Sequence, residues 1–256
     1  MTLKQRVSQL NINWTSFIGV LFFFIVLAAL FNIYGRVTGW LRSEQDAPIK
    51  QLQIQGQHLH VKENDVRRQL NQMALGSFFT ADVEKVRTSV QSLPWVYSAT
   101  IRKQWPDTLK IHIVEQQAKA QWNETQLLNQ YGEVFTASLL AGETLPQLQG
   151  PKDSEKKALK LLEDFQALLS LNDYQIQQLE LSQRYAISLQ LDSGIQLKLG
   201  RISAIERLQR FIDLYPLIQK QQKKKEIQFI DLRYDTGFAV RWRENTKENQ
   251  RKSKLG

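Results

Sequence analysis

The feature that most constrains this chain is a long uncharged segment near its N-terminus. No charged residue occurs between Arg6 and Arg36, and the stretch from Trp14 to Tyr34 is almost entirely apolar. About 20 apolar residues in a helix are enough to cross the ~30 Å hydrocarbon core of a bilayer. Aromatic rings flank the segment, with Trp40 just beyond it, as is typical of the headgroup level. The sequence therefore predicts one membrane-spanning helix.

A cleavable signal peptide is the alternative, because Lys4 and Arg6 precede the apolar run as in a signal n-region. Signal h-regions have about 7 to 15 residues, however, and this run is longer. Residues 33–39 also offer no convincing small-x-small cleavage site. We interpret the segment as an uncleaved anchor. The Lys and Arg residues on its two sides do not decide its orientation.

Charge and cysteine content exclude some classes of function. Basic residues exceed acidic ones, 34 to 25, and they concentrate at 220–225 and 243–254. They do not alternate with aromatic residues as on a nucleic-acid-binding face, so no nucleic-acid partner is expected. We interpret them as a solvated loop and a disordered tail, with attraction to anionic lipid or wall polymer as the alternative. The absence of cysteine excludes disulfides and thiolate nucleophiles.

The first folded region reads as a small α+β unit. A strand is predicted at 49–56, followed by two helices with Asn64 and Thr80 as their N-caps. Alternating apolar residues then predict a hairpin over 99–113, with its turn at Trp105–Thr108. The order strand, helix, helix, strand, strand places the helices on one face of a sheet.

The second region, from about residue 117, reads as β-rich with two helices. Apolar residues at helical spacing predict helices over 153–171 and 203–219. Strand pairs are predicted over 127–135, 187–199 and 227–242, each around a turn. Because these pairs are consecutive hairpins, we expect one antiparallel sheet.

A series of short motifs occurs between residues 93 and 242. These motifs are Leu93-Pro94-Trp95-Val96, Ala99-x-Ile101-Arg102-Lys103-x-Trp105-Pro106-Asp107-x-Leu109-x-Ile111, Val114-Glu115, Ala120-x-Trp122, Leu145-Pro146-x-Leu148-x-Gly150-Pro151, Leu197-x-Leu199-Gly200-Arg201, Leu214-Tyr215-Pro216 and Ile230-Asp231-Leu232-Arg233-Tyr234-Asp235-x-Gly237-x-Ala239-Val240-x-Trp242. They resemble the motifs of the bacterial FtsQ/DivIB division family. The resemblance implies a cytoplasmic tail, one inner-membrane helix, a periplasmic POTRA domain and a periplasmic β domain.

The expected fold class is therefore α+β: a single transmembrane helix, then a POTRA domain, then a β-rich domain with two helices and an antiparallel sheet. The expected boundaries are a cytoplasmic tail at 1–13, the transmembrane helix at 14–34, a linker at 35–48, the POTRA domain at 49–116, the β domain at 117–242 and a disordered basic tail at 243–256.

Catalytic and metal motifs are sparse. His58 and His60 form an H-x-H pair, but no third ligand has diagnostic spacing. Asp231 and Asp235 suggest a carboxylate pair for cutting glycan strands, although turn chemistry explains Asp235 more simply. Phosphate-binding, nucleophile-elbow and zinc-protease motifs are absent from the sequence. We therefore expect no enzyme, no metal and no cofactor.

Binding is better supported than catalysis. The last predicted strand, 238–242, precedes a tail with no apolar periodicity, so it can lie at a sheet edge and accept a partner strand. The alternative is that the basic tail protects this terminal strand from pairing with another chain. The resemblance implies that this edge binds the C-terminal segment of FtsB, which pairs with FtsL as a coiled coil. The residues matched to the family's contacts, or adjoining them, are Arg184, Arg233, Tyr234, Thr236, Gly237, Phe238, Ala239, Val240 and Trp242.

The resemblance also implies that the POTRA domain contacts FtsK and other division proteins, and that the protein concentrates at the division septum. The expected function is a noncatalytic scaffold that links early and late division proteins. Two alternatives stay open from the sequence. One is a membrane-anchored cell-wall hydrolase, and the other is a POTRA-bearing assembly or secretion component.

Overall fold

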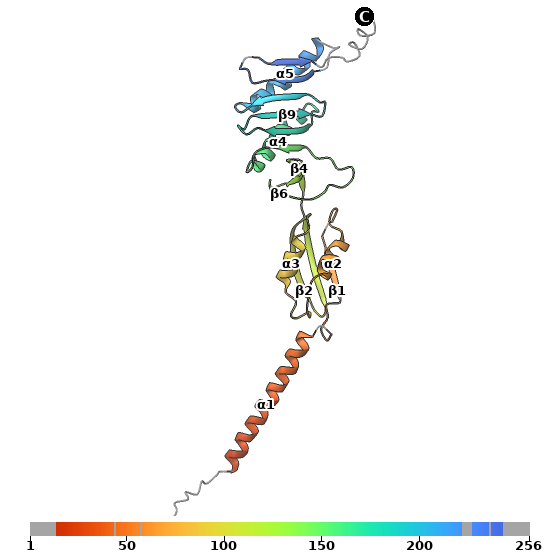
Figure 1. Ribbon diagram of the computed structural model, residues 1–256, viewed down its shortest axis with the longest axis vertical. Coiled ribbons are helices and arrows are strands. Elements are labelled where there is room, and N and C mark those ends of the chain that lie inside the picture. The colour runs from red at the N-terminus through yellow and green to blue at the C-terminus, as the bar shows by residue number, and fades with distance from the viewer. Residues whose placement is uncertain (1–13, 44, 57, 222–226, 236, 243–256) are drawn as a thin grey trace, which may run out of the picture. The chain divides into compact units, whose positions relative to one another are not determined.

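The computed structural model describes residues 14–43, 45–56, 58–221, 227–235 and 237–242. The chain divides into two compact units, Met1–Glu115 and Gln116–Gly256. The first contains a long helix and a small domain, and the second is a larger sheet domain (Figure 1). The predicted tails at 1–13 and 243–256 lie outside the described residues.

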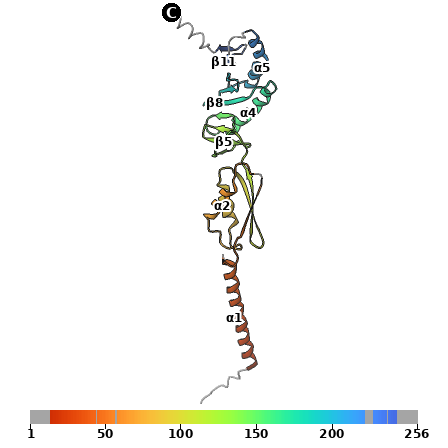
Figure 2. The same ribbon diagram turned by 90° about the vertical axis from the view of Figure 1, so that its right-hand side faces the viewer.

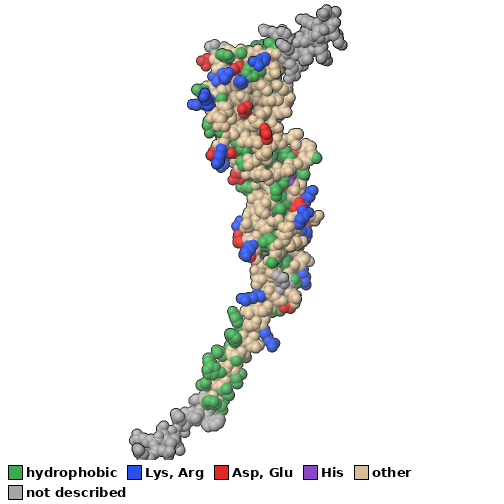
Figure 3. All heavy atoms as spheres, viewed as in Figure 1, with side chains coloured by type: hydrophobic (Ala, Val, Ile, Leu, Met, Phe, Trp, Pro, Cys, Tyr) green, Lys and Arg blue, Asp and Glu red, His purple; other side chains and the backbone are tan. Residues whose placement is uncertain are grey.

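Helix α1 (Trp14–Arg42) is the predicted anchor and is longer than predicted. Its apolar part is the one helix among the described residues that is long and apolar enough to cross a membrane. Hydrophobic side chains cover it in the space-filling view (Figure 3). Residues 35–42 of the predicted linker are helical, and no proline occurs before Pro48 to interrupt the helix. Thr38 lies within the helix, and its hydroxyl donates to the carbonyl of Tyr34.

The first domain has the predicted order of elements around a three-stranded sheet. Its strands lie in the order β1-β3-β2, with β1 parallel and β2 antiparallel to β3. The two helices cover one face of the sheet, which is visible at α2 in Figure 2. The elements are β1 (Gln51–Gln55), α2 (Glu63–Asn71), α3 (Val83–Gln91), β2 (Val96–Gln104) and β3 (Thr108–Glu115).

Both predicted helix caps are wrong. Helix α2 begins one residue before Asn64, and Lys62 occupies its N-cap position without a side-chain bond. Helix α3 is capped by Asp82, whose carboxylate accepts the backbone N–H groups two and three residues further on. The hydroxyl of Thr80 instead accepts the N–H of Ser77, in the turn before α3.

A partly buried carboxylate holds the loop between β1 and α2. Glu115, at the end of β3, accepts the N–H groups of Leu59, His60 and Val61 at 3.0, 3.0 and 2.6 Å. Burial raises the pKa of Glu115, but these three hydrogen bonds outweigh it and the net pKa is lowered. Of the histidine pair noted in the sequence, His60 packs its ring on Trp95 at a centroid distance of 3.6 Å.

We expect Glu115→Gln to destabilise the first domain by about 2 kcal/mol at pH 7, because a charged acceptor of three hydrogen bonds is lost. A lowered pKa means that the carboxylate stabilises the fold above its unfolded pKa and ceases to do so as the pH falls through the lower folded value. Denaturant unfolding at pH 7 and pH 3 should therefore give a smaller difference between wild type and variant at pH 3. An equal difference at both pH values would contradict this role.

The second domain is built on a nine-stranded sheet in the order β12-β11-β10-β9-β8-β7-β4-β5-β6. The elements are β4 (Ala118–Trp122), β5 (Gln126–Asn129), β6 (Val134–Phe135), β7 (Gln147–Gln149), α4 (Glu155–Ser170), β8 (Ile176–Leu181), β9 (Ile187–Leu191), β10 (Gln196–Gly200), α5 (Ala204–Gln221), β11 (Ile227–Asp231) and β12 (Ala239–Trp242).

The sheet is mixed, and the prediction of an antiparallel sheet is wrong. Strands β7 and β8 are parallel, and so are β10 and β11 and also β4 and β7. Helix α4 connects β7 to β8, and α5 connects β10 to β11. A helical crossover returns the chain to the same end of the sheet, so the next strand runs parallel to the last.

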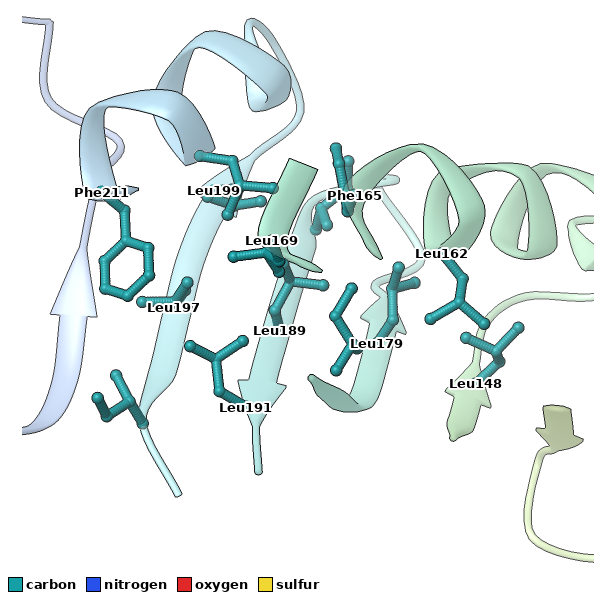
Figure 4. Packing of buried hydrophobic residues seen from close by; sticks show 14 of the residues in the cluster. Leu148, Leu162, Phe165, Leu169, Leu179, Leu189, Leu191, Leu197, Leu199 and Phe211 are labelled. Atoms are coloured by element: carbon teal, nitrogen blue, oxygen red, sulfur yellow. The ribbon is translucent and has the colours of Figure 1, made fainter. Parts of the chain in front are cut away.

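Both helices cover one face of this sheet and form the core with it (Figures 2 and 4). Phe165 and Leu169 of α4 and Phe211 of α5 are fully buried against strand residues such as Leu189 and Leu197. The opposite face is polar, and its central strands carry Gln178, Glu180, Ser188, Gln190, Gln196 and Lys198 around a shallow pocket. The buried face fixes the register, because a shift of one residue would exchange the two faces.

Candidate functional site

The last strand lies at an edge of the large sheet, as predicted. Strand β12 is the first strand in the sheet order, and it pairs with β11. An edge strand presents a row of backbone N–H and C=O groups to which another chain can add a strand. The opposite edge, β6, has two residues against four in β12. Strand β12 is therefore the longer template of the two edges.

The direction of the backbone groups in β12 follows from one hydrogen bond in the neighbouring ladder. The N–H of Leu232 donates to the carbonyl of Lys198 in β10, so the backbone groups of Asp231 point the other way, toward β12. Asp231 lies opposite Ala239, and these two residues therefore form a hydrogen-bonded pair. The N–H and C=O of the next residue, Val240, consequently point outward from the sheet edge.

The side chains of β12 alternate between the two faces. Val240 and Trp242, together with Phe238 just before the strand, are partly buried and pack against the domain core. Arg241 lies on the open face, where its guanidinium is 5.7 Å from the ring centroid of Phe229. The residues predicted to contact a partner therefore divide into two groups. Those of β12 offer backbone groups and help to close the core, whereas the preceding connection carries exposed side chains.

The connection between β11 and β12 is held by two arginines of α5. The Arg207 guanidinium donates to the carbonyls of Leu199, at 2.7 Å, and Arg233, at 3.0 Å. Arg210 donates to the carbonyl of Tyr234 at 2.9 Å. The Tyr234 side chain itself stays 57% exposed. The two arginines thus fix the backbone of the connection and leave its side chains accessible.

Arg207 and Arg210 were not predicted as functional residues from the sequence. The signal that was available is their spacing of three residues, which places both on one face of α5. Spacing alone does not show which carbonyls they meet.

Gly200 makes room for one of these arginines. Its φ is +74°, in the left-handed region that favours glycine. A Cβ atom built on Gly200 would lie 2.9 Å from Arg207 Nη1 and 3.2 Å from Arg233 Cγ. The Leu199-Gly200 turn therefore needs glycine both for its backbone and for the close approach of the Arg207 side chain.

Asp231 and Arg233 form a bidentate ion pair. The Arg233 guanidinium donates to both carboxylate oxygens, at 2.9 and 2.6 Å. These bonds hold the pKa of Asp231 below its usual range. Asp235, the other half of the carboxylate pair considered from the sequence, is almost fully exposed and lies 3.9 Å from Arg207. Each carboxylate thus faces an arginine, which does not favour acid–base catalysis by the pair.

The remaining predicted site residues lie in different places. Arg184 is exposed in the turn between β8 and β9. The strand register puts this turn at the same end of the sheet as the connection from β11 to β12. Strand β9 is nevertheless three strand spacings, about 14 Å, from β12. Thr236 lies outside the described residues.

Metal-binding geometry is absent from the part of the chain that the structure describes, where no three His, Asp or Glu side chains form a cluster that could hold an ion. The third histidine, His112, lies exposed on β3 between Ile111 and Ile113, which are buried.

We expect Arg207→Gln to loosen the connection between β11 and β12, because two carbonyls lose a charged donor. Amide hydrogen exchange over residues 231–235 should accelerate at least tenfold, and the domain should lose about 1–2 kcal/mol of stability. Arg201→Gln, at an exposed arginine just before α5, is the matched control. Unchanged exchange in Arg207→Gln would show that the connection is held by other contacts.

Comparison with known proteins agrees with this architecture. Residues 47–116 match the family model for the FtsQ-type POTRA domain, and residues 120–233 match the model for the C-terminal part of the cell division protein FtsQ/DivIB. The chain is 37% identical over 228 residues to the cell division protein FtsQ of Aliivibrio fischeri, covering 88% of both proteins.

Two further relatives carry the same description. The cell division protein FtsQ of Escherichia coli is 34% identical over 247 residues, which are 93% of this chain and 89% of that protein. The protein of this name from Vibrio cholerae is 38% identical over 227 residues, which are 88% of this chain and 86% of that protein. Matches of this extent confirm the resemblance seen in the sequence motifs. Together with the apolar helix, the POTRA domain and the sheet domain, they show that this chain belongs to the FtsQ/DivIB family of membrane-anchored cell division proteins.

Proposed function

We propose that this protein is a noncatalytic scaffold of the bacterial division complex, and that strand β12 binds the C-terminal segment of FtsB as an added strand. The observation that carries the proposal is the position of β12 at the edge of the sheet in the described part of the chain, with the backbone of Val240 pointing outward. Main-chain hydrogen bonds supply affinity in such an addition, and neighbouring side chains supply selectivity. FtsL joins through its coiled coil with FtsB.

The side chains beside the edge suit the selective part of this contact. Tyr234 is exposed on a connection that Arg207 and Arg210 already hold in place, so binding orders little new structure. A partner strand on β12 lies about 19 Å from β9, so contact with Arg184 requires the partner to continue over the end of the sheet. Arg184 is therefore a secondary contact in this proposal.

The proposal extends to topology and recruitment. We infer that the N-terminus is cytoplasmic, that both domains lie in the periplasm, and that the protein concentrates at the division septum. The POTRA domain is assigned the contacts with FtsK and other division proteins. Family membership and the apolar helix support the inner membrane as the location.

We expect Tyr234→Ala to weaken binding of the FtsB segment at least about 30-fold, or about 2 kcal/mol, as is typical of an aromatic hot spot. The measurement is calorimetry with the full chain in nanodiscs and a peptide of the FtsB C-terminal segment from the same organism. Tyr131→Ala, an exposed tyrosine near the opposite sheet edge, should bind as wild type does. Wild-type affinity in Tyr234→Ala would remove Tyr234 from the contact.

The absence of catalysis has its own test. The purified chain is incubated with peptidoglycan, and soluble products are analysed by chromatography. Release of muropeptides above the level of a heat-inactivated sample would contradict the scaffold and favour the hydrolase alternative.

A further inference from the structure

One end of the first domain adjoins the C-terminal end of α1. Strands β1 and β3 both begin there and β2 ends there, because β1 is parallel and β2 antiparallel to β3. The N–H of Lys50, just after the anchor, donates to the carbonyl of Asp107 in the β2–β3 turn at 2.9 Å. We call residues 45–50, 77–82 and 103–108 the membrane-proximal end.

Contacts join this end to the helix itself. The Ser77 hydroxyl donates to the carbonyl of Leu41 in the last turn of α1. The rings of Trp40 and Phe79 are 5.9 Å apart between centroids. The loop before α3 is therefore packed directly on the end of the anchor.

The length of α1 gives the depth of this contact. Its 29 residues span about 43 Å, whereas the hydrocarbon core is about 30 Å thick. The uncharged stretch ends at Arg36, and Trp40 lies about 6 Å further along the helix axis. The polar headgroup region extends about 5–8 Å beyond the hydrocarbon on each side. Trp40 thus lies at headgroup level, and Phe79, in contact with it, is within reach of the same level.

Aromatic side chains are exposed at this end. Trp105, in the β2–β3 turn, is 76% exposed, more than any other large hydrophobic residue described in the first domain. Phe79 is 41% exposed. The ammonium of Lys103 donates to the Phe79 carbonyl at 2.9 Å, which fixes this loop against the end of β2. Aromatic rings, tryptophan above all, favour the headgroup level of a bilayer.

We propose that the membrane-proximal end is a second membrane-binding surface, in which Trp105 and Phe79 enter the phospholipid headgroup region beside the anchor. The charged residues of this end are Asp46, Lys50, Asp82, Lys103 and Asp107, so its charge is mixed and neutral phospholipids are sufficient. The surface restrains the domain on the bilayer, whereas α1 alone would only tether it. This inference concerns lipid and does not depend on FtsB binding.

The test uses the absence of cysteine from the chain, which allows labelling at a single introduced thiol. A Gln104→Cys variant carries an environment-sensitive fluorophore next to Trp105, and Leu59→Cys carries it on an exposed loop at the opposite end of the domain. Both full-length proteins are placed in phosphatidylcholine nanodiscs containing a lipid with a headgroup nitroxide. Quenching should be at least threefold greater at position 104 than at position 59, and equal quenching would overturn the proposal.

A second variant separates binding from simple proximity. Trp105→Ser and the double variant Trp105→Ser, Phe79→Ser are made in the Gln104→Cys background, with circular dichroism to verify the fold. Quenching should fall at least twofold in Trp105→Ser and further in the double variant. Unchanged quenching in a folded Trp105→Ser protein would show that the end lies near the bilayer only because α1 tethers it, and would overturn the proposal.

Discussion

We expect Val240→Pro to abolish binding of the FtsB segment, with at least a 100-fold loss of affinity, and to leave the domain folded. Proline removes the backbone N–H that points outward from the edge, and its ring obstructs a partner strand. The pairing of β12 with β11 uses the backbone of Ala239 instead, so it persists. The measurement is calorimetry on the full chain in nanodiscs, with circular dichroism to verify the fold.

Two controls distinguish backbone from side-chain effects. Val240→Ala keeps the N–H and removes only packing atoms, so it should retain binding within about tenfold. Ala239→Pro removes a donor that faces β11, so it should lower the melting temperature of the domain. A folded Val240→Pro protein with wild-type affinity would mean that the partner docks elsewhere on the sheet.

The second large effect concerns the first domain. We expect replacement of residues 49–115 by an unrelated soluble domain of similar size to abolish concentration at midcell, because the proposed contacts with FtsK and other division proteins reside there. The boundary follows the structure, since Glu115 ends the first compact unit. Fluorescence microscopy of a tagged protein should show an even membrane signal in place of a ring at the septum.

The matched control keeps the first domain and replaces residues 116–242 instead. It should still form rings if recruitment depends on the first domain alone. Rings from the protein that lacks residues 49–115, at normal expression level, would assign septal targeting to another part of the chain.

Local patterns in the sequence predicted the helices and strands well. They failed for the helix caps and for the strand directions, which tertiary contacts determine. Val66 and Leu70 of α2, like Val86 and Val90 of α3, stand four residues apart, and each pair lies on a buried helical face. The N-cap of α3 was predicted wrongly because Thr80 and Asp82 are both good N-cap residues. In the folded turn, the Thr80 hydroxyl accepts a hydrogen bond from the Ser77 N–H and so does not cap the helix. Strand direction was missed because hairpin signals describe neighbours in sequence, whereas α4 and α5 bring parallel strands together.

The candidate edge was predictable in part. A terminal strand before a polar tail predicted β12 as an edge, and the sheet order agrees. The outward direction of the Val240 backbone could not be predicted, because it depends on the register with β11 and on the bond from Leu232 to Lys198. The roles of Arg207 and Arg210 depend on distances between residues more than 20 positions apart, which spacing within one helix does not contain.

The two edges of the large sheet are unequal. Strand β6 is two residues long, whereas β12 is four residues long. In the part of the sheet that the structure describes, only β12 therefore offers a template of more than two residues for strand addition. Under the proposed function, each copy of the protein thus pairs with one added strand and ends a series of paired strands without extending it.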